Sequence, residues 1–124
     1  MNDFTNETDE KRLHRRVCSL VAEEDIVLFS ASGGAHFVAR LLDFSHGGAF
    51  VYSADPSVAA EVGCRYKLYF QSRGAMFHLE GTLVRRKLQF FAFQFQNVTA
   101  LDLVEIRSKL ARMEMLAARL SVEH

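Results

Sequence analysis

A run of alternating phenylalanines is the feature that most constrains how this chain can fold. Phe91, Phe93 and Phe95 stand two apart, with alanine and glutamine between them. Successive side chains of a β-strand point to opposite faces, so this spacing predicts a strand with one aromatic face. Phenylalanines in a row could stack on nucleic-acid bases, but within an apolar series we interpret all three as core residues. The segment 88–96 is therefore expected to be a strand that lines a hydrophobic core.

Short apolar segments of the same kind recur along most of the chain and are separated by turn residues. Strands are expected at residues 17–31, in two halves, and at residues 37–42, 49–52, 65–71, 75–86 and 88–96. Turns are expected at residues 32–34, 54–57 and 72–74, and a short helical turn at residues 58–62. About six short strands with tight connections favour a mainly β fold, an antiparallel β-barrel. The eleven phenylalanines would supply its core.

The last segment has helical spacing instead. Thr99, with Asp102 three residues later, is typical of an N-cap with an acidic partner. Apolar residues then recur every three or four positions, at Leu103, Ile106, Leu110, Met113, Ala117 and Leu120. We expect the first half of this helix to pack on the barrel, and residues 113–120 to offer a dimer or partner surface. The chain thus divides into a flexible acidic tail (1–10), a barrel with a basic leader (11–99) and a C-terminal helix (100–124).

Length and charge exclude several classes of protein. At 124 residues the chain is long enough for one domain with its own core. Its 15 basic and 15 acidic residues cancel, so no overall field attracts nucleic acid or an anionic membrane. No apolar run reaches the ~20 residues that a membrane helix needs, so no membrane insertion is expected. Cys18 and Cys64 lie far apart and no signal peptide precedes them, which favours reduced thiols in a cytoplasmic protein.

A polar corner lies between the strands expected at residues 37–42 and 49–52. Asp43 and Ser45 are two apart and so share one face of an extended segment. Gly47 and Gly48 follow, and we expect them to reverse the chain with positive φ and to leave backbone N–H groups open to a ligand. On its own, the string D-x-S-x-x-G is also ordinary turn chemistry, in which the side chains bond their own backbone.

A second motif lies upstream of this corner. Arg12 and Arg16 are four apart within a basic run, residues 11–16. R-x-x-x-R followed by D-x-S-x-x-G, in this order and with a barrel-like series of strands, resembles the PilZ domain family. Asp43, Ser45 and Gly48 fill the second motif, and all five motif positions carry the expected residue types. The resemblance runs from residue 11 to the C-terminal helix.

The resemblance implies a six-stranded antiparallel PilZ-type β-barrel with a C-terminal α-helix, acting as a receptor for cyclic di-GMP. It implies no cofactor and no catalytic activity, and it implies an unidentified downstream protein as partner. The residues expected to contact the ligand are Arg12, Arg16, Asp43, Ser45 and Gly48, with Gly47, Lys11, Arg15 and His46 beside them. Arginine suits this ligand because its planar fork bonds phosphate or the guanine edge and its flat face stacks on a purine. In the family, the residue at the position of Lys11 is linked to whether the domain binds one nucleotide or a stacked pair. A basic residue there favours the stacked pair.

Other functions fit the residues less well. The same fold could act as an adaptor through protein contacts alone, which the intact motifs argue against. A small barrel could also bind single-stranded RNA, which the neutral net charge argues against. Asp43, Ser45 and His46 are the residue types of a hydrolase triad, but they are too close in sequence for the histidine to lie between the other two. The five histidines show no metal-binding spacing, so no metal site is expected.

Overall fold

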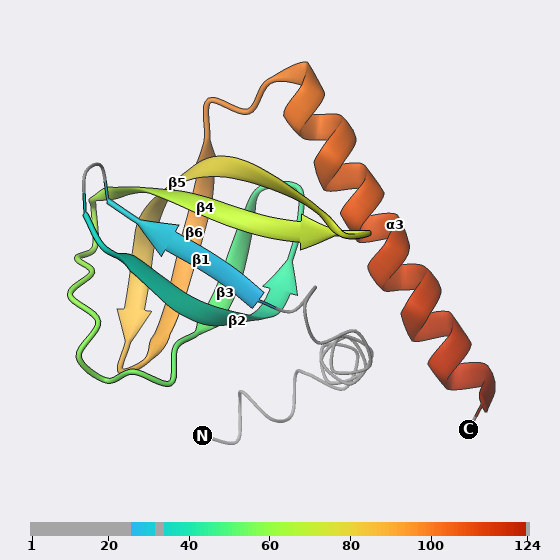
Figure 1. Ribbon diagram of the computed structural model, residues 1–124, viewed down its shortest axis with the longest axis horizontal. Coiled ribbons are helices and arrows are strands. Elements are labelled where there is room, and N and C mark those ends of the chain that lie inside the picture. Colours follow the sequence, from blue (N-terminus) through green and yellow to red (C-terminus); the bar gives the residue numbers. More distant parts are fainter. Residues whose placement is uncertain (1–25, 32–33, 124) are drawn as a thin grey trace.

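The fold is a closed antiparallel β-barrel with a C-terminal helix beside it (Figure 1). The computed structural model describes residues 26–31 and 34–123. In this part of the chain the elements are β1 (Ile26–Ser30), β2 (His36–Phe44), β3 (Gly48–Tyr52), β4 (Arg65–Ser72), β5 (Ala75–Lys87), β6 (Phe90–Gln96) and α3 (Ala100–Glu123). The predicted six-stranded barrel with a C-terminal helix is confirmed. The second half of the first expected strand is β1, whereas residues 17–25 lie outside the described residues.

The strands close the barrel in the order β1-β2-β3-β6-β5-β4. Closure comes from β1, where Leu28 lies opposite Val38 of β2 on one side and Tyr69 of β4 on the other. The turn predicted between β4 and β5 has Arg73 at φ 55° and Gly74 at φ 78°. Positive φ at both central residues matches the twist of antiparallel strands and gives a tight hairpin. A closed barrel leaves no long unpaired sheet edge, so its strands are held in register on both sides.

Aromatic rings fill the barrel. The three alternating phenylalanines of β6 are all buried, as predicted. Ring centroids 5.2 to 6.0 Å apart join Phe29 to a first group, Phe37, Tyr66, Phe91 and Phe93. A second group surrounds Phe70 at 5.1 to 6.0 Å and consists of Phe44, Phe77 and Phe95. These spacings are those of favourable stacked, tilted or edge-on ring pairs, so these phenylalanines serve the core. Phe50 and Phe90, by contrast, are half-buried, stack on each other at 5.9 Å and lie outside the core cluster.

The prediction of a helical turn at residues 58–62 is wrong. Residues 58–61 have no regular structure, and a turn follows at residues 62–63. Val58 and Ala60 are buried while Ala59 is exposed, so the segment lies along the barrel with alternating sides. The backbone N–H of Glu61 donates to the hydroxyl of Tyr66 at 2.9 Å. This bond satisfies a backbone donor without a helical partner.

The helix α3 is capped and anchored as its sequence suggests. Asp102 N–H donates to Thr99 Oγ1 and Thr99 N–H donates to Asp102 Oδ2, both at 3.0 Å, which is a reciprocal capping box. Ile106 is fully buried and Met113 is 6% exposed, and both belong to the core cluster. Figure 1 shows α3 passing the end of β4, where the Nζ of the buried Lys109 donates to the carbonyl of Gln71 at 2.6 Å. A dimer through residues 113–120 stays a prediction.

Candidate functional site

The β2–β3 hairpin brings together the five predicted residues of the polar corner. Asp43 lies near the end of β2 and Gly48 begins β3, with Ser45, His46 and Gly47 forming the connection. Ser45, His46 and Gly47 are exposed, and Asp43 is half-buried. Phe44 points the other way and is 4% exposed, with its ring 5.1 Å from Phe70. The core therefore holds the hairpin in place from beneath while its polar atoms face outward.

A β-bulge aims Asp43 outward. Leu41 pairs with Val51 and Asp43 pairs with Phe50, so one residue of β2 is extra at this point. Leu41 and Phe44 are both buried although they are three apart, which strict alternation does not allow. Without the bulge, Asp43 would follow Leu41 into the core. Bulges that re-aim a side chain in this way are common beside functional sites.

Ser45 shapes the turn with its own side chain. Its backbone N–H donates to the carbonyl of Gly48 at 2.9 Å. Its Oγ lies 3.3 Å from the N–H of Gly47, which donates to it, and 3.4 Å from the carbonyl of Gly48, to which it donates. One carboxylate oxygen of Asp43 accepts the backbone N–H of Phe44 at 3.0 Å. The amide of Gly47, expected to be open to a ligand, is thus already engaged by a long bond.

The two glycines have different roles, and the expected positive φ at Gly47 and Gly48 is wrong. The glycines with positive φ in the described residues are Gly63 and Gly74. At Gly48, an added Cβ would overlap the carbonyl oxygen of Phe93 on the neighbouring strand β6. At Gly47, an added Cβ would meet nothing within 4 Å. Gly48 is needed for close approach of two backbones rather than for a left-handed turn.

The basic half of the predicted site is not described. Lys11, Arg12, Arg15 and Arg16 lie outside the described residues, which begin at Ile26. Contact between these side chains and the polar corner therefore stays a prediction. What the structure describes is the barrel half of the site, with a carboxylate, a hydroxyl and a backbone turn.

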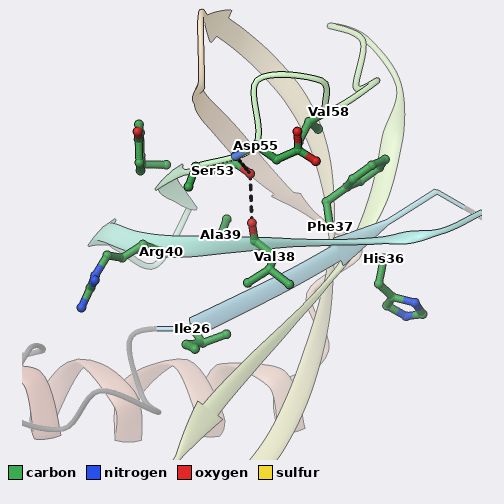
Figure 2. Close-up of a pocket in the computed structure, with 11 residues that line it drawn as sticks. Ile26, His36, Phe37, Val38, Ala39, Arg40, Ser53, Asp55 and Val58 are labelled. Atoms are coloured by element: carbon green, nitrogen blue, oxygen red, sulfur yellow. Dashed lines mark hydrogen bonds between the residues drawn. The ribbon is translucent and has the colours of Figure 1, made fainter.

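The sequence analysis did not predict a second feature of this surface, a pocket beside β2. It has a volume of about 570 Å³ and lies between β2 and the segment after β3. Figure 2 shows Arg40 at one end and Ser53 above the strand, with the Oγ of Ser53 donating to the carbonyl of Val38 at 3.0 Å. Arg40 pairs with Tyr52 in register and is exposed. A charged residue inside the apolar segment 37–42 was the available signal for this surface.

Asp55 closes one edge of this pocket. The Oγ of Ser57 donates to Asp55 Oδ1 at 2.7 Å, and the Ser57 backbone N–H donates to the same oxygen at 2.9 Å. These two bonds, the hydroxyl first, lower the pKa of Asp55 below its ordinary value. The turn predicted at residues 54–57 is therefore held by hydrogen bonds that favour the ionised form of Asp55.

The described residues offer neither a metal-binding cluster nor a membrane-spanning helix. Within ranges 26–31 and 34–123, no three His, Cys, Asp or Glu side chains are grouped to hold a metal ion. The described helix α3 is not apolar enough to cross a membrane, and no other helix there could do so.

The fold and the hairpin together define a small closed β-barrel domain with a solvent-facing polar corner at one hairpin and a C-terminal helix. The family model described as PilZ domain matches residues 10–112 of the chain. The chain belongs to the PilZ domain family. The comparison with curated proteins gave no significant match.

Solved structures of similar fold bear out the architecture. The PilZ domain of YcgR from Escherichia coli, solved with cyclic di-GMP, has a TM-score of 0.69 at 17% identity, covering 80% of this chain and 88% of that one. The PilZ domain of CeSA from a cellulose-synthesizing bacterium has a TM-score of 0.62 at 16% identity, covering 72% and 91%. PlzA of Borreliella burgdorferi, in complex with cyclic di-GMP, has a TM-score of 0.53 at 18% identity, covering 69% and 32%. At these identities the likeness shows the fold.

Proposed function

We propose that this chain is a receptor for cyclic di-GMP, and that the β2–β3 hairpin is the rigid half of its binding site. The observation that carries the proposal is the outward-facing D-x-S-x-x-G hairpin, held by Phe44 and by the β3–β6 pairing. Membership of the PilZ family and fold similarity to PilZ domains solved with cyclic di-GMP support the choice of ligand. A preorganised hairpin lowers the ordering cost of binding.

The chemistry of the hairpin suits a guanine nucleotide. The carboxylate of Asp43 can accept from the N1–H and N2–H₂ groups of guanine, which adenine does not present in that arrangement. The exposed Ser45 hydroxyl, at the hairpin connection, can exchange its long bonds within the turn for a shorter bond to the ligand. Bonds to charged groups contribute roughly 1.5–3 kcal/mol each. The corner therefore supplies base recognition rather than charge neutralisation.

Neutralising the two phosphates falls to the leader. Arg12 and Arg16, with Lys11 and Arg15 beside them, would close over the ligand from the N-terminal side. Five or six charge-assisted bonds, set against an association cost of several kcal/mol, leave an affinity on the order of micromolar or better. Lys11 favours two stacked nucleotides per chain.

The proposed receptor has no catalytic role. Ligand binding would fix the leader against the barrel and create a surface that a downstream protein recognises, in the manner of an order–disorder switch. In that scheme the chain works in the cytoplasm and converts the concentration of the nucleotide into a protein contact.

Isothermal titration calorimetry tests the proposal. The full chain is titrated with cyclic di-GMP, with cyclic di-AMP and with a single-stranded oligonucleotide. We expect binding of cyclic di-GMP, at two nucleotides per chain, and at least a hundredfold preference over cyclic di-AMP. Asp43→Asn keeps the shape of the side chain but removes the carboxylate, and should lose much of that preference. Equal affinity for the three ligands, or no heat with cyclic di-GMP, would contradict the proposal.

A further inference from the structure

The helix α3 carries a second apolar stripe that faces away from the barrel. Leu101 is 79% exposed, Val104 is 60% exposed and Met115 is 44% exposed. Together with smaller residues they recur at spacings of three and four, at Leu101, Val104, Ser108, Ala111, Met115 and Ala118. This spacing is that of the a and d positions of a heptad, the seam along which two helices pack.

The stripe lies on the opposite side of α3 from the core seam. At 3.6 residues per turn, its centre is about 160° around the helix from the seam of Ile106, Leu110 and Met113. Ile106 and Met113 are buried, and Leu110 packs against the core cluster. The helix therefore presents one apolar side to its own barrel and a second one to solvent. A solvated helix face ordinarily carries polar residues in these positions.

The charges that flank the stripe select a partner. Glu105 and Arg112 lie on one side of the stripe, and Arg107 and Glu114 lie on the other. Each side thus has one acidic and one basic residue seven positions apart. A second copy of α3, laid antiparallel, would place Glu105 opposite Arg112 and Arg107 opposite Glu114. Charges flanking the seam set the partner and the orientation of paired helices.

We propose that the solvent face of α3 binds the same face of a second copy of this chain, with the two helices antiparallel. The apolar layers then match from end to end. Leu101 faces Ala118 of the second copy, Val104 faces its Met115, and Ser108 faces its Ala111. Large residues meet small or flexible ones at the ends, and small residues at the centre let the helices approach closely. The contact is two-fold symmetric, because every pair occurs twice.

A parallel arrangement fits the sequence less well. It would place Arg107 beside Arg112 of the second copy, twice, and like charges beside a seam are destabilising. The antiparallel arrangement replaces both repulsions with attractions. The contact extends about 26 Å along each helix. A contact of this length buries an area at the small end of the range for specific interfaces, so the fraction of dimer should depend on protein concentration. No residue of the 43–48 hairpin takes part, so the dimer stands without the proposed ligand.

Charge reversal tests the proposal on residues that the barrel does not use. Arg107 and Glu114 are both exposed, and no charged residue lies three or four positions from either of them among residues 100–118. Sedimentation equilibrium of the full chain should show a dimer. Arg107→Glu should weaken it at least tenfold, since two attractions become repulsions, and Glu114→Arg should do the same. The double variant, which swaps the two charges, should restore the dimer to within threefold of wild type.

The outcomes separate this arrangement from its alternatives. Val104→Glu should also abolish the dimer, whereas Leu88→Glu should leave it intact, because Leu88 is 78% exposed and lies in the β5–β6 turn. Circular dichroism confirms that each variant keeps its fold. A wild-type chain that is monomeric at every concentration overturns the proposal. So does a dimer that Arg107→Glu leaves unchanged, or one that it strengthens, as the parallel arrangement requires.

Discussion

Replacing Gly48 by alanine should damage the barrel, whereas the same change at Gly47 should not. The two residues are adjacent, lie in the same hairpin and have φ values outside the left-handed range. They differ in what a new methyl group would meet. At Gly48 the methyl would overlap the carbonyl oxygen of Phe93 and lie 3.3 Å from its carbonyl carbon, and at Gly47 it would meet nothing. The pair is therefore a matched test of backbone approach.

The cost at Gly48 follows from what must move. Phe93 lies in β6, where it pairs with Ala49, so relieving the overlap means separating the ends of β3 and β6. The N–H of Phe95 donates to the carbonyl of Gly47 at 2.8 Å, and this bond lies next to the overlap. Overpacking costs about 1–3 kcal/mol and a weakened backbone hydrogen bond about 1 kcal/mol. We expect Gly48→Ala to lower the free energy of unfolding by about 2–4 kcal/mol.

Urea unfolding followed by circular dichroism measures the difference. Gly47→Ala should change the free energy of unfolding by less than about 1 kcal/mol and could raise it, because alanine restricts the unfolded chain. A loss of about 2–4 kcal/mol is a large part of the 5–15 kcal/mol of an ordinary domain. The reasoning is refuted if the two variants have the same midpoint, or if Gly47→Ala is the more destabilised.

Three other changes test separate parts of the molecule. Arg16→Ala should weaken cyclic di-GMP binding tenfold or more, on the order of 1.4 kcal/mol or above, with an unchanged circular dichroism spectrum; unchanged affinity in calorimetry would exclude the leader from the site. Lys109→Met removes the buried bond to the Gln71 carbonyl and should cost about 1–3 kcal/mol in urea unfolding; a wild-type midpoint would show that the anchor is unimportant. Ser57→Ala removes the main cause of the lowered pKa of Asp55, so an NMR titration should show that pKa rising toward its ordinary value. Because a lowered pKa favours the charged form, the bond to Asp55 should stabilise the fold above the ordinary pKa and be lost as pH falls through the folded one; an unmoved titration would contradict this cause.

Local patterns in the sequence were enough to predict most of the strands, the helix and the fold class. The alternation of Phe91, Phe93 and Phe95 placed a strand and its buried side correctly, because period two is a property of the strand alone. The capping box of Thr99 and Asp102 was equally readable, since both bonds join residues three apart. Closure of the barrel then follows from several short strands with tight turns.

The misread features depend on contacts between distant residues. The overlap that makes Gly48 necessary involves Phe93, forty-five positions away in the sequence and adjacent only once the barrel closes. The bulge that turns Asp43 outward is visible only in the pairing of β2 with β3. The path of residues 58–61 follows the burial of Val58 and Ala60 against the barrel, which forms only when distant strands pair. A single sequence without its fold contains no local sign of any of these contacts.

The hairpin motif therefore combines two kinds of requirement that mutations can separate. Gly48 is fixed by the barrel, because the strand beside it leaves no room for a side chain. Asp43 and Ser45 lie on the outward side of the hairpin, where their side chains bond the hairpin backbone at 3.0 to 3.4 Å. If the proposed receptor function is right, Asp43→Asn should change ligand preference with little loss of stability, and Gly48→Ala should lose stability first. A chain that keeps Gly48 but lacks the outward carboxylate would then retain the barrel without its base selectivity, which is the state that an adaptor of this fold would have.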